Sequence, residues 1–251
     1  MTNIILSGCN GKMGQVISTL AADREDVNIV FGVDINTEKR FGYEVYSSFD
    51  DAPATQGVVI DFSHPSCFEA VTAYCRNNKV PLVMATTGLS PEQRQELTEI
   101  SKDVAVFFSA NMSLGVNLLV SLVKKAAALL EDSFDIEIVE KHHNQKIDAP
   151  SGTALMIADE IADTLTNPPE YVYDRHSVRK KRGKSEIGIH AVRGGTIVGE
   201  HDVIFAGNDE IIEIRHTAMS KEIFAVGSIK AAKFIDGKPA GMYDMKNIMD
   251  V

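Results

Sequence analysis

The segment KHHNQKIDAPSGTAL, residues 141 to 155, concentrates groups that could bind an anion and transfer a proton. His142 and His143 are adjacent, Lys146 follows them, and Ser151–Thr153 opens a predicted helix. Backbone N–H groups at a helix start bind carboxylates, and a nearby lysine adds a full positive charge. A histidine, with an ordinary pKa of about 6.5, can donate a proton to a bound anion. The segment therefore predicts proton transfer to a small, doubly anionic substrate.

Each of these residues also has a purely structural explanation, as a surface histidine, a helix cap or a solvated lysine. A metal site made of His142, His143 and Asp148 is a further alternative. Adjacent residues at a strand end point to opposite faces, however, and no third group of ligands completes a coordination sphere. We therefore expect no metal, and we favour an anion and proton site because all these groups occur in one short segment.

A glycine-rich turn near the amino terminus is typical of dinucleotide binding. It lies between an apolar run and a helical pattern, although Asn10 replaces the middle glycine of the usual fingerprint. Asp34 ends the next apolar run, 34 − 14 = 20 residues after the last glycine, where an acidic side chain can bind the adenosine ribose. The residues expected at the cofactor in this turn are Gly8, Cys9, Asn10, Gly11, Lys12, Met13 and Gly14.

Asp34 also bears on the choice of cofactor. Its carboxylate can accept hydrogen bonds from both ribose hydroxyls but repels a 2′-phosphate, and Ile35 beside it supplies no cation. We therefore expect NADH to be preferred, although Lys12, Lys39 or Arg40 could weaken the preference and permit NADPH.

The elements around these residues predict an α/β protein in two parts. In residues 1–112, apolar runs alternate with helical patterns, which predicts a Rossmann-like doubly wound parallel sheet. The expected strands are Asn3–Leu6, Val27–Val33, Val58–Asp61, Pro81–Ala85 and Val104–Phe108, with helices at Gly14–Ala22, at Pro65–Asn77 and from Ser90 onward. A second α+β domain with a mixed sheet should follow, with a helix at Leu114–Glu131, a strand at Phe134–Glu140, a helix ending at Leu165, and several strands between Glu186 and His216.

The composition argues against several classes of protein. The 35 acidic and 25 basic residues give a net charge of −10, which disfavours binding to nucleic acid. The basic segment Arg175–Lys184 is expected to be a solvated loop, with a polyanion site as the alternative. No apolar run is long enough to span a membrane, no secretion signal is evident, and the three cysteines lack a metal-like spacing. These features predict a cytoplasmic protein.

A series of motifs resembles one family, the 4-hydroxy-tetrahydrodipicolinate reductases, also called dihydrodipicolinate reductases, of bacterial lysine and diaminopimelate synthesis. The motifs are GCNGKMG, DFSHP, ATTG, SANMSLGVNLL, EKHHNQKIDAPSGTAL, VRGGTIVGEHDV and GKPAGMYDM. They run in this order over nearly the whole chain, and the stretch from the histidine pair to PSGTAL is very specific.

The resemblance implies roles for individual residues. It implies that His142 donates the proton and that Lys146 is its catalytic partner. The implied substrate contacts are His143, Ser151, Gly152 and Thr153. The residues implied to line the nicotinamide side are Ala85, Thr86, Thr87, Ser109, Ala110, Asn111 and Met112. The family often has glycine at the position of Ala85 and arginine at those of Lys12, Ile35 and Lys221, and these departures bear on cofactor preference and pocket geometry.

The resemblance also implies which domain binds the cofactor, which binds the substrate, and how many copies of the chain assemble. Residues 1–112 and 217–251 would form the dinucleotide-binding domain, residues 113–216 would form the substrate-binding and oligomerisation domain, and the protein would be a homotetramer. The implied reaction is hydride transfer to ring C4 of a small dicarboxylate, with the proton coming from His142. Closure of a cleft between the domains would precede it.

Two alternatives remain open at this point. One is another two-domain oxidoreductase, such as a homoserine or semialdehyde dehydrogenase. The latter needs a catalytic cysteine, whereas Cys9, Cys67 and Cys75 all fall in the expected nucleotide domain. The other is a regulator that senses NADH without turning it over.

Overall fold

Two compact units make up the part of the chain that the computed structural model describes, residues 1–249. The first consists of Met1–Ser113 and of the chain from Glu222 onward, and the second is the single segment Leu114–Lys221. The second unit continues to Lys221, beyond the expected limit at residue 216, because the last strand of its sheet still pairs at Ala218. None of the described helices is long and apolar enough to cross a bilayer.

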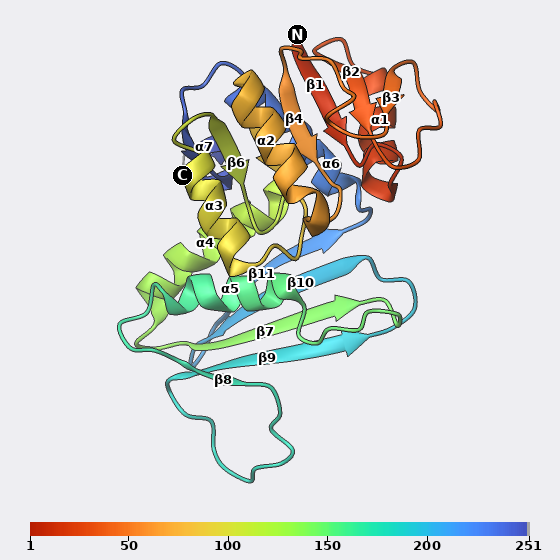
Figure 1. The fold of residues 1–251 in the computed structure, drawn as a ribbon. Coiled ribbons are helices and arrows are strands. Elements are labelled where there is room, and N and C mark those ends of the chain that lie inside the picture. The colour runs from red at the N-terminus through yellow and green to blue at the C-terminus, as the bar shows by residue number, and fades with distance from the viewer. Residues whose placement is uncertain (250–251) are drawn as a thin grey trace. The chain divides into compact units, whose positions relative to one another are not determined.

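The first unit is built on a seven-stranded parallel sheet (Figure 1). Its strands are β1 (Thr2–Ser7), β2 (Val27–Val33), β3 (Glu44–Tyr46), β4 (Val58–Asp61), β5 (Leu82–Met84), β6 (Ala105–Phe108) and β12 (Gly241–Tyr243). They lie in the order β12-β6-β5-β4-β1-β2-β3. The chain order reverses between β1 and β4, and sheets of this kind bind ligands at the carboxyl ends of the strands beside such a switch point.

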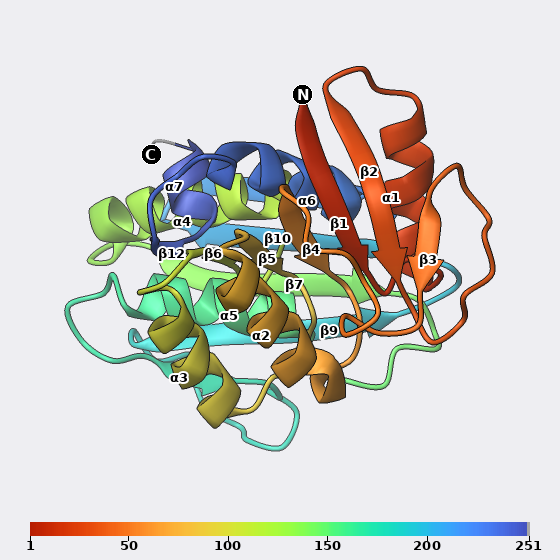
Figure 2. The same ribbon diagram turned by 45° about the horizontal axis from the view of Figure 1, so that its top comes forward.

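Helices cover both faces of this sheet, as Figure 2 shows. Their bounds are α1 (Lys12–Ala22), α2 (Phe68–Asn78), α3 (Pro91–Ile100), α6 (Glu222–Ile235) and α7 (Met245–Met249), with a 3₁₀ turn η1 (Pro65–Cys67) before α2. Phe68 and Leu97 pack from α2 and α3 onto one face, while Phe234 of α6 meets Phe107 of β6 on the other. The predicted doubly wound sheet is confirmed.

The second unit is a five-stranded mixed sheet with two helices on one face. The elements are α4 (Leu114–Leu130), β7 (Asp135–His142), α5 (Gly152–Ala162), β8 (Glu170–Val172), β9 (Glu186–Arg193), β10 (Gly199–Ala206) and β11 (Ile211–Ala218). The order is β11-β10-β7-β9-β8, and central β7 is parallel to β9 and antiparallel to β10. Ile136 and Ile138 alternate inward along β7 against Ile157 and Ile161 of α5. The predicted mixed sheet is also confirmed.

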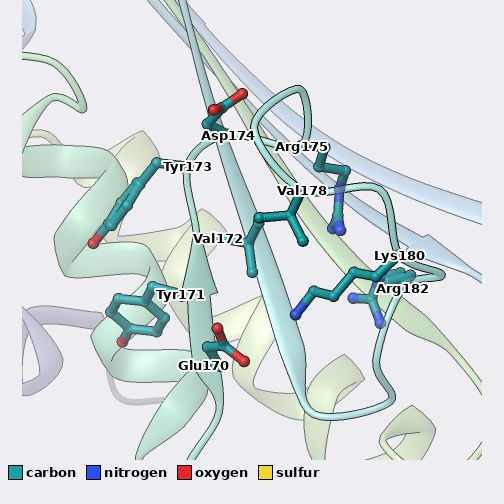
Figure 3. A pocket seen from close by; sticks show the side chains of 9 residues that line it. All are labelled: Glu170, Tyr171, Val172, Tyr173, Asp174, Arg175, Val178, Lys180 and Arg182. Atoms are coloured by element: carbon teal, nitrogen blue, oxygen red, sulfur yellow. The ribbon is translucent and has the colours of Figure 1, made fainter.

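The basic segment 175–184 is a largely exposed loop, as expected, but two of its arginines pair with carboxylates. Arg175 pairs with Glu137 at 2.6 Å and with Glu186 at 2.7 Å, and Arg182 contacts Asp135 and Glu137 at 2.9 and 3.0 Å. These arginines line an open pocket of about 290 Å³ with residues of β8 (Figure 3). Because carboxylates of the same unit neutralise them, they are poorly suited to a polyanion.

Candidate active site

The turn from β1 to α1 has the close backbone packing that a pyrophosphate site needs. Gly8 has a left-handed φ of 75°, and a Cβ there would lie 2.8 Å from the carbonyl oxygen of Phe62. A Cβ on Gly14 would collide with the carbonyl oxygens of Gly8 and Cys9. The N-cap of α1 is Gly11, which supplies no side chain to cap the first N–H groups of the helix. This cradle therefore fits the phosphates of a dinucleotide.

Asp34 lies beside this turn and helps to shape it. Its carboxylate accepts hydrogen bonds from the backbone N–H groups of Asn10, at 2.9 Å, and Asn36, at 3.0 Å. The side chain of Asn10 donates to the carbonyl oxygens of Asn36 and Glu38. Asn10 therefore ties the glycine turn to the loop after β2, which gives a physical reason for a side chain where the usual fingerprint has glycine.

The remaining predicted cofactor residues follow β5 and β6 at the same edge of the sheet. Ala85 and Thr86 are buried, and the Thr86 hydroxyl donates to the carboxylate of Asp61 at 2.6 Å. Thr87 and Ala110 are exposed. After β6, the Ser109 hydroxyl donates to the carbonyl of Asn111 at 2.9 Å, and Met112 is buried. The predicted cofactor residues thus occupy the loops at the carboxyl ends of β1, β2, β5 and β6, except Lys12, Met13 and Gly14, which form the first turn of α1.

Two cysteines of this unit are poorly suited to act as nucleophiles. Burial, with the negative charge of Asp34, raises the pKa of the Cys9 thiol to about 11, and burial also raises the pKa of Cys75. Both thiols therefore stay protonated near neutral pH. This is unfavourable for the alternative of a cysteine-dependent semialdehyde dehydrogenase.

The predicted proton donor lies at the end of β7, in the second unit. His142 is buried, and its Nδ1 bonds the Glu140 carboxylate at 2.6 Å. Arg193 of β9 donates to both oxygens of the same carboxylate, at 2.7 and 2.8 Å. Burial acts to raise the pKa of Glu140, but the hydrogen bonds from Arg193, His142 and the Ser151 backbone outweigh it and lower the pKa. Glu140 is therefore an ionised acceptor.

The loop from β7 to α5 carries the predicted anion-binding groups. Ser151 caps α5 by accepting from the Ala154 N–H at 3.1 Å, and its own N–H donates to Glu140 at 3.0 Å. Gly152, the first helical residue, is exposed. The Lys146 ammonium bonds the Asp148 carboxylate at 2.8 Å. This bond, together with the Gly152 N–H, holds the pKa of the Asp148 carboxyl below its usual value.

A second histidine lies next to the first. The rings of His142 and His201 meet edge to face with centroids 5.3 Å apart, and Nε2 of His201 is 3.1 Å from the Ser151 hydroxyl. Burial, together with the charge of His142, lowers the pKa of His201 to about 4. His201 is therefore uncharged near neutral pH. His143, the residue that follows β7, is half-buried.

Several of these residues were missed by sequence reasoning. Glu140 could have been found, because residues two apart on a strand share a face, so Glu140 accompanies His142. Arg193 gives no such signal, since only the pairing of β9 with β7 places it opposite His142. His201, on β10, is missed for the same reason. In residues 1–249 no three His, Cys, Asp or Glu side chains are grouped to hold a metal ion.

Comparison with known proteins relates both units to one family. Two family models match the chain. The model described as dihydrodipicolinate reductase, N-terminus, matches residues 2–112, and the model described as dihydrodipicolinate reductase, C-terminus, matches residues 115–249. A 4-hydroxy-tetrahydrodipicolinate reductase of Clostridium tetani is 51% identical, covering 98% of this chain and 96% of the relative. Its counterpart in Caldanaerobacter subterraneus subsp. tengcongensis is 52% identical, covering 99% and 98%.

A solved structure has the same fold. The dipicolinate-bound dihydrodipicolinate reductase from Paenisporosarcina sp. TG-14 matches with a TM-score of 0.81 at 25% identity and covers 99% of both chains.

Proposed function

Since this chain belongs to the dihydrodipicolinate reductase family, we propose that it reduces 4-hydroxy-tetrahydrodipicolinate, or the dihydrodipicolinate ring formed from it by loss of water, to tetrahydrodipicolinate. This reaction belongs to the synthesis of lysine and diaminopimelate. NADH, held by the glycine turn and Asp34 of the first unit, would supply the hydride for ring C4. The residues of the chain bind the dicarboxylate, hold it still and provide a proton.

The observation that carries the proposal is the cluster at the end of β7. His142 lies there with Lys146 and the start of α5, so a proton donor, an ammonium group and helical N–H groups belong to one compact unit. A planar ring with two carboxylates suits these groups, because one carboxylate can meet Lys146 while the other meets the backbone N–H groups of Gly152 and Thr153; the Ser151 N–H already donates to Glu140. His143 is available as a further substrate contact.

The proton transfer falls to His142. Reduction at C4 shifts electron density toward the ring nitrogen, and protonation of the resulting enamine completes the reaction. An imidazolium at His142 would be stabilised by the substrate's negative charge and could give up this proton. Holding the ring in a fixed orientation supplies much of the rate, because it removes the entropy cost of bringing reactants together.

A coupled assay tests the function. Fresh product of dihydrodipicolinate synthase is mixed with the protein and NADH, and consumption of NADH is followed. We expect rapid oxidation that falls steeply in His142→Gln, with NADH binding retained. NADH binding without oxidation would favour the sensing regulator instead.

The preference for NADH rests on charges near Asp34. Lys39 pairs with Glu44, and Arg40 bonds Glu38 at 2.7 Å, so these cations are already engaged. We therefore expect kcat/KM with NADH to exceed that with NADPH. Asp34→Asn should shift the ratio toward NADPH by about tenfold, because one repulsive charge is removed. A wild-type protein that prefers NADPH would contradict this assignment.

The assembly proposed is a homotetramer in the cytoplasm. The helices of the second unit cover one face of its sheet. The other face presents the half-buried Glu137, together with Lys141 and Arg215, which pair with Glu200 and Asp202. Such a sheet face, which carries no described helix of the second unit, suits contact with further copies of the chain. Light scattering of the purified protein measures the number of copies.

A further inference from the structure

Glu140 lies at the centre of the site but takes no part in the proposed chemistry. It is 0% exposed and shares a face of β7 with His142. Its Oε2 accepts from Nδ1 of His142 and from Arg193, and its Oε1 accepts from the Ser151 N–H and from Arg193. Four N–H donors therefore converge on one ionised carboxylate.

We propose that Glu140 is a positioning residue, which fixes the tautomer of His142 and its placement relative to the anion-binding start of α5. This role rests on the proposed function, in which His142 gives a proton to the substrate.

The tautomer follows from the bond between the two side chains. An ionised carboxylate can only accept hydrogen bonds, so the 2.6 Å bond requires a proton on Nδ1 of His142. Nε2 is then the nitrogen that gives its proton to the substrate. The neutral imidazole that remains keeps its Nδ1–H on Glu140, so this carboxylate is never protonated in the cycle.

Gly199 keeps the neighbourhood of Nε2 open. A Cβ at this position of β10 would lie 3.1 Å from Nε2 of His142, closer than side chains normally approach. Arg193 binds the same carboxylate as the ring, and the neutral His201 meets the ring edge to face. The reactive nitrogen therefore faces a position where any side chain would crowd it.

The same carboxylate also fixes the anion-binding groups. Through Ser151 it holds the first turn of α5, and Arg193, which it binds, also donates to the carbonyl oxygen of Asp148 at 2.7 Å. One side chain thus sets the separation between the proton donor and the N–H groups that meet a carboxylate. A rigid ring must contact both, so an error in this separation should lower turnover more than affinity.

A comparison on the opposite face of β7 provides a matched control. Glu137 accepts from Arg182 at 3.0 Å and bonds His190 at 2.8 Å, so it also joins an arginine and a histidine. Alternation along the strand directs it away from His142. Neutralising Glu137 therefore perturbs β7 similarly without touching the proton donor.

The first test measures the tautomer directly. NMR spectra of substrate-free protein labelled with ¹⁵N-histidine are recorded, with His142→Gln identifying the resonances of that ring. We expect the Nδ1–H form in the wild type and in Glu137→Gln, and a redistribution toward Nε2–H in Glu140→Gln. A wild-type ring protonated on Nε2, or a tautomer unaltered in Glu140→Gln, would overturn the inference.

The second test separates kcat from binding. Glu140→Gln should lower kcat by about 10- to 100-fold, the range found when the carboxylate partner of a metal-ligating histidine is lost. The change in KM should be smaller, and the Kd for NADH should be unchanged. Glu140→Asp, which keeps the charge, should recover part of the loss. Wild-type kcat in Glu140→Gln would refute the role.

Gly199→Ala provides a test if Glu140→Gln does not fold. It should lower kcat while His142 keeps the Nδ1–H form, and a wild-type kcat would show that Nε2 is not the donor. If the ring has the expected tautomer but the wild type never oxidises NADH with the substrate, the proposed function fails while the positioning of His142 stands.

Discussion

The pair of Lys146 and Asp148 places an internal carboxylate where a substrate carboxylate is proposed to bind. The ammonium bonds Asp148 at 2.8 Å, and Lys146 is only 20% exposed, whereas Asp148 is 58% exposed. A bound dicarboxylate must therefore compete with Asp148 for the lysine. Such a half-exposed pair is worth at most about 1 kcal/mol, so the competition is easily overcome.

This competition predicts opposite effects for the two residues. Asp148→Asn should tighten binding of dipicolinate by about two- to fivefold, because the lysine no longer has an ionised partner. Lys146→Ala should weaken it and also lower kcat. Isothermal titration with dipicolinate measures both, and weaker binding in Asp148→Asn would show that this carboxylate supports the ligand rather than competing with it.

At the scale of elements, the position of α1 depends on the absence of a side chain at Gly14. This glycine lies against the carbonyl groups of the turn that precedes the helix. Any side chain here must push the start of α1 away from β1, and the N–H groups aimed at the pyrophosphate would move with it.

Gly14→Ala should therefore weaken NADH binding by more than about tenfold, since a displacement of a few tenths of an ångström spoils several hydrogen bonds together. Fluorescence of bound NADH measures the Kd. Gly42→Ala is the control, because a Cβ there meets nothing within 4 Å, and its Kd should match the wild type. Equal affinities in the two variants would remove the glycine cradle from the cofactor site.

The sequence predicts the central elements well and the edges poorly. Val27–Val33 and Val58–Asp61 match the observed strands, because central parallel strands are buried on both faces and appear as continuous apolar runs. The three-residue edge strands β3, β8 and β12 were missed, since such short segments carry little periodicity. Helix α6 was also missed, although the chain was expected to return to the first unit after residue 216.

The same limit applies to the candidate site. Groups close together in the sequence, from His142 to Thr153, could be predicted because one segment contains them. The contact between Glu140 and Arg193 joins residues of different strands, and only the register of β7 with β9 brings them together. Pairing between distant strands cannot be read from local composition.

At the scale of the whole molecule, buried histidines make stability depend on pH. Burial and the charge of His142 lower the pKa of His201 to about 4, and burial also lowers that of His216. Between that value and the ordinary pKa of about 6.5, the unfolded chain binds protons that the folded chain does not. Stability therefore rises with pH in this window.

We expect the contribution of His201, roughly 3 kcal/mol, to be complete above about pH 6.5 and to be lost as the pH falls toward 4. Hydrogen exchange of the β10 amides reports the opening free energy of the second unit. His201→Asn should flatten its pH dependence, whereas the exposed His176→Asn should not. A free energy that stays constant from about pH 7 to about pH 4.5 would contradict the burial of a neutral His201.

The first unit is formed by two separate segments of the chain, and this affects how it folds during synthesis. Strand β12 pairs with the outer edge of β6, and α6 buries Ala225, Ile229 and Ile235 in the first unit, yet both elements come after the whole second unit in the chain. A growing chain leaving the ribosome can complete Leu114–Lys221 while the sheet made earlier still lacks a strand and a covering helix. During that interval, apolar residues of the earlier sheet are open to chaperones and to neighbouring chains, so arrest of translation just after Lys221 should leave a species prone to aggregation.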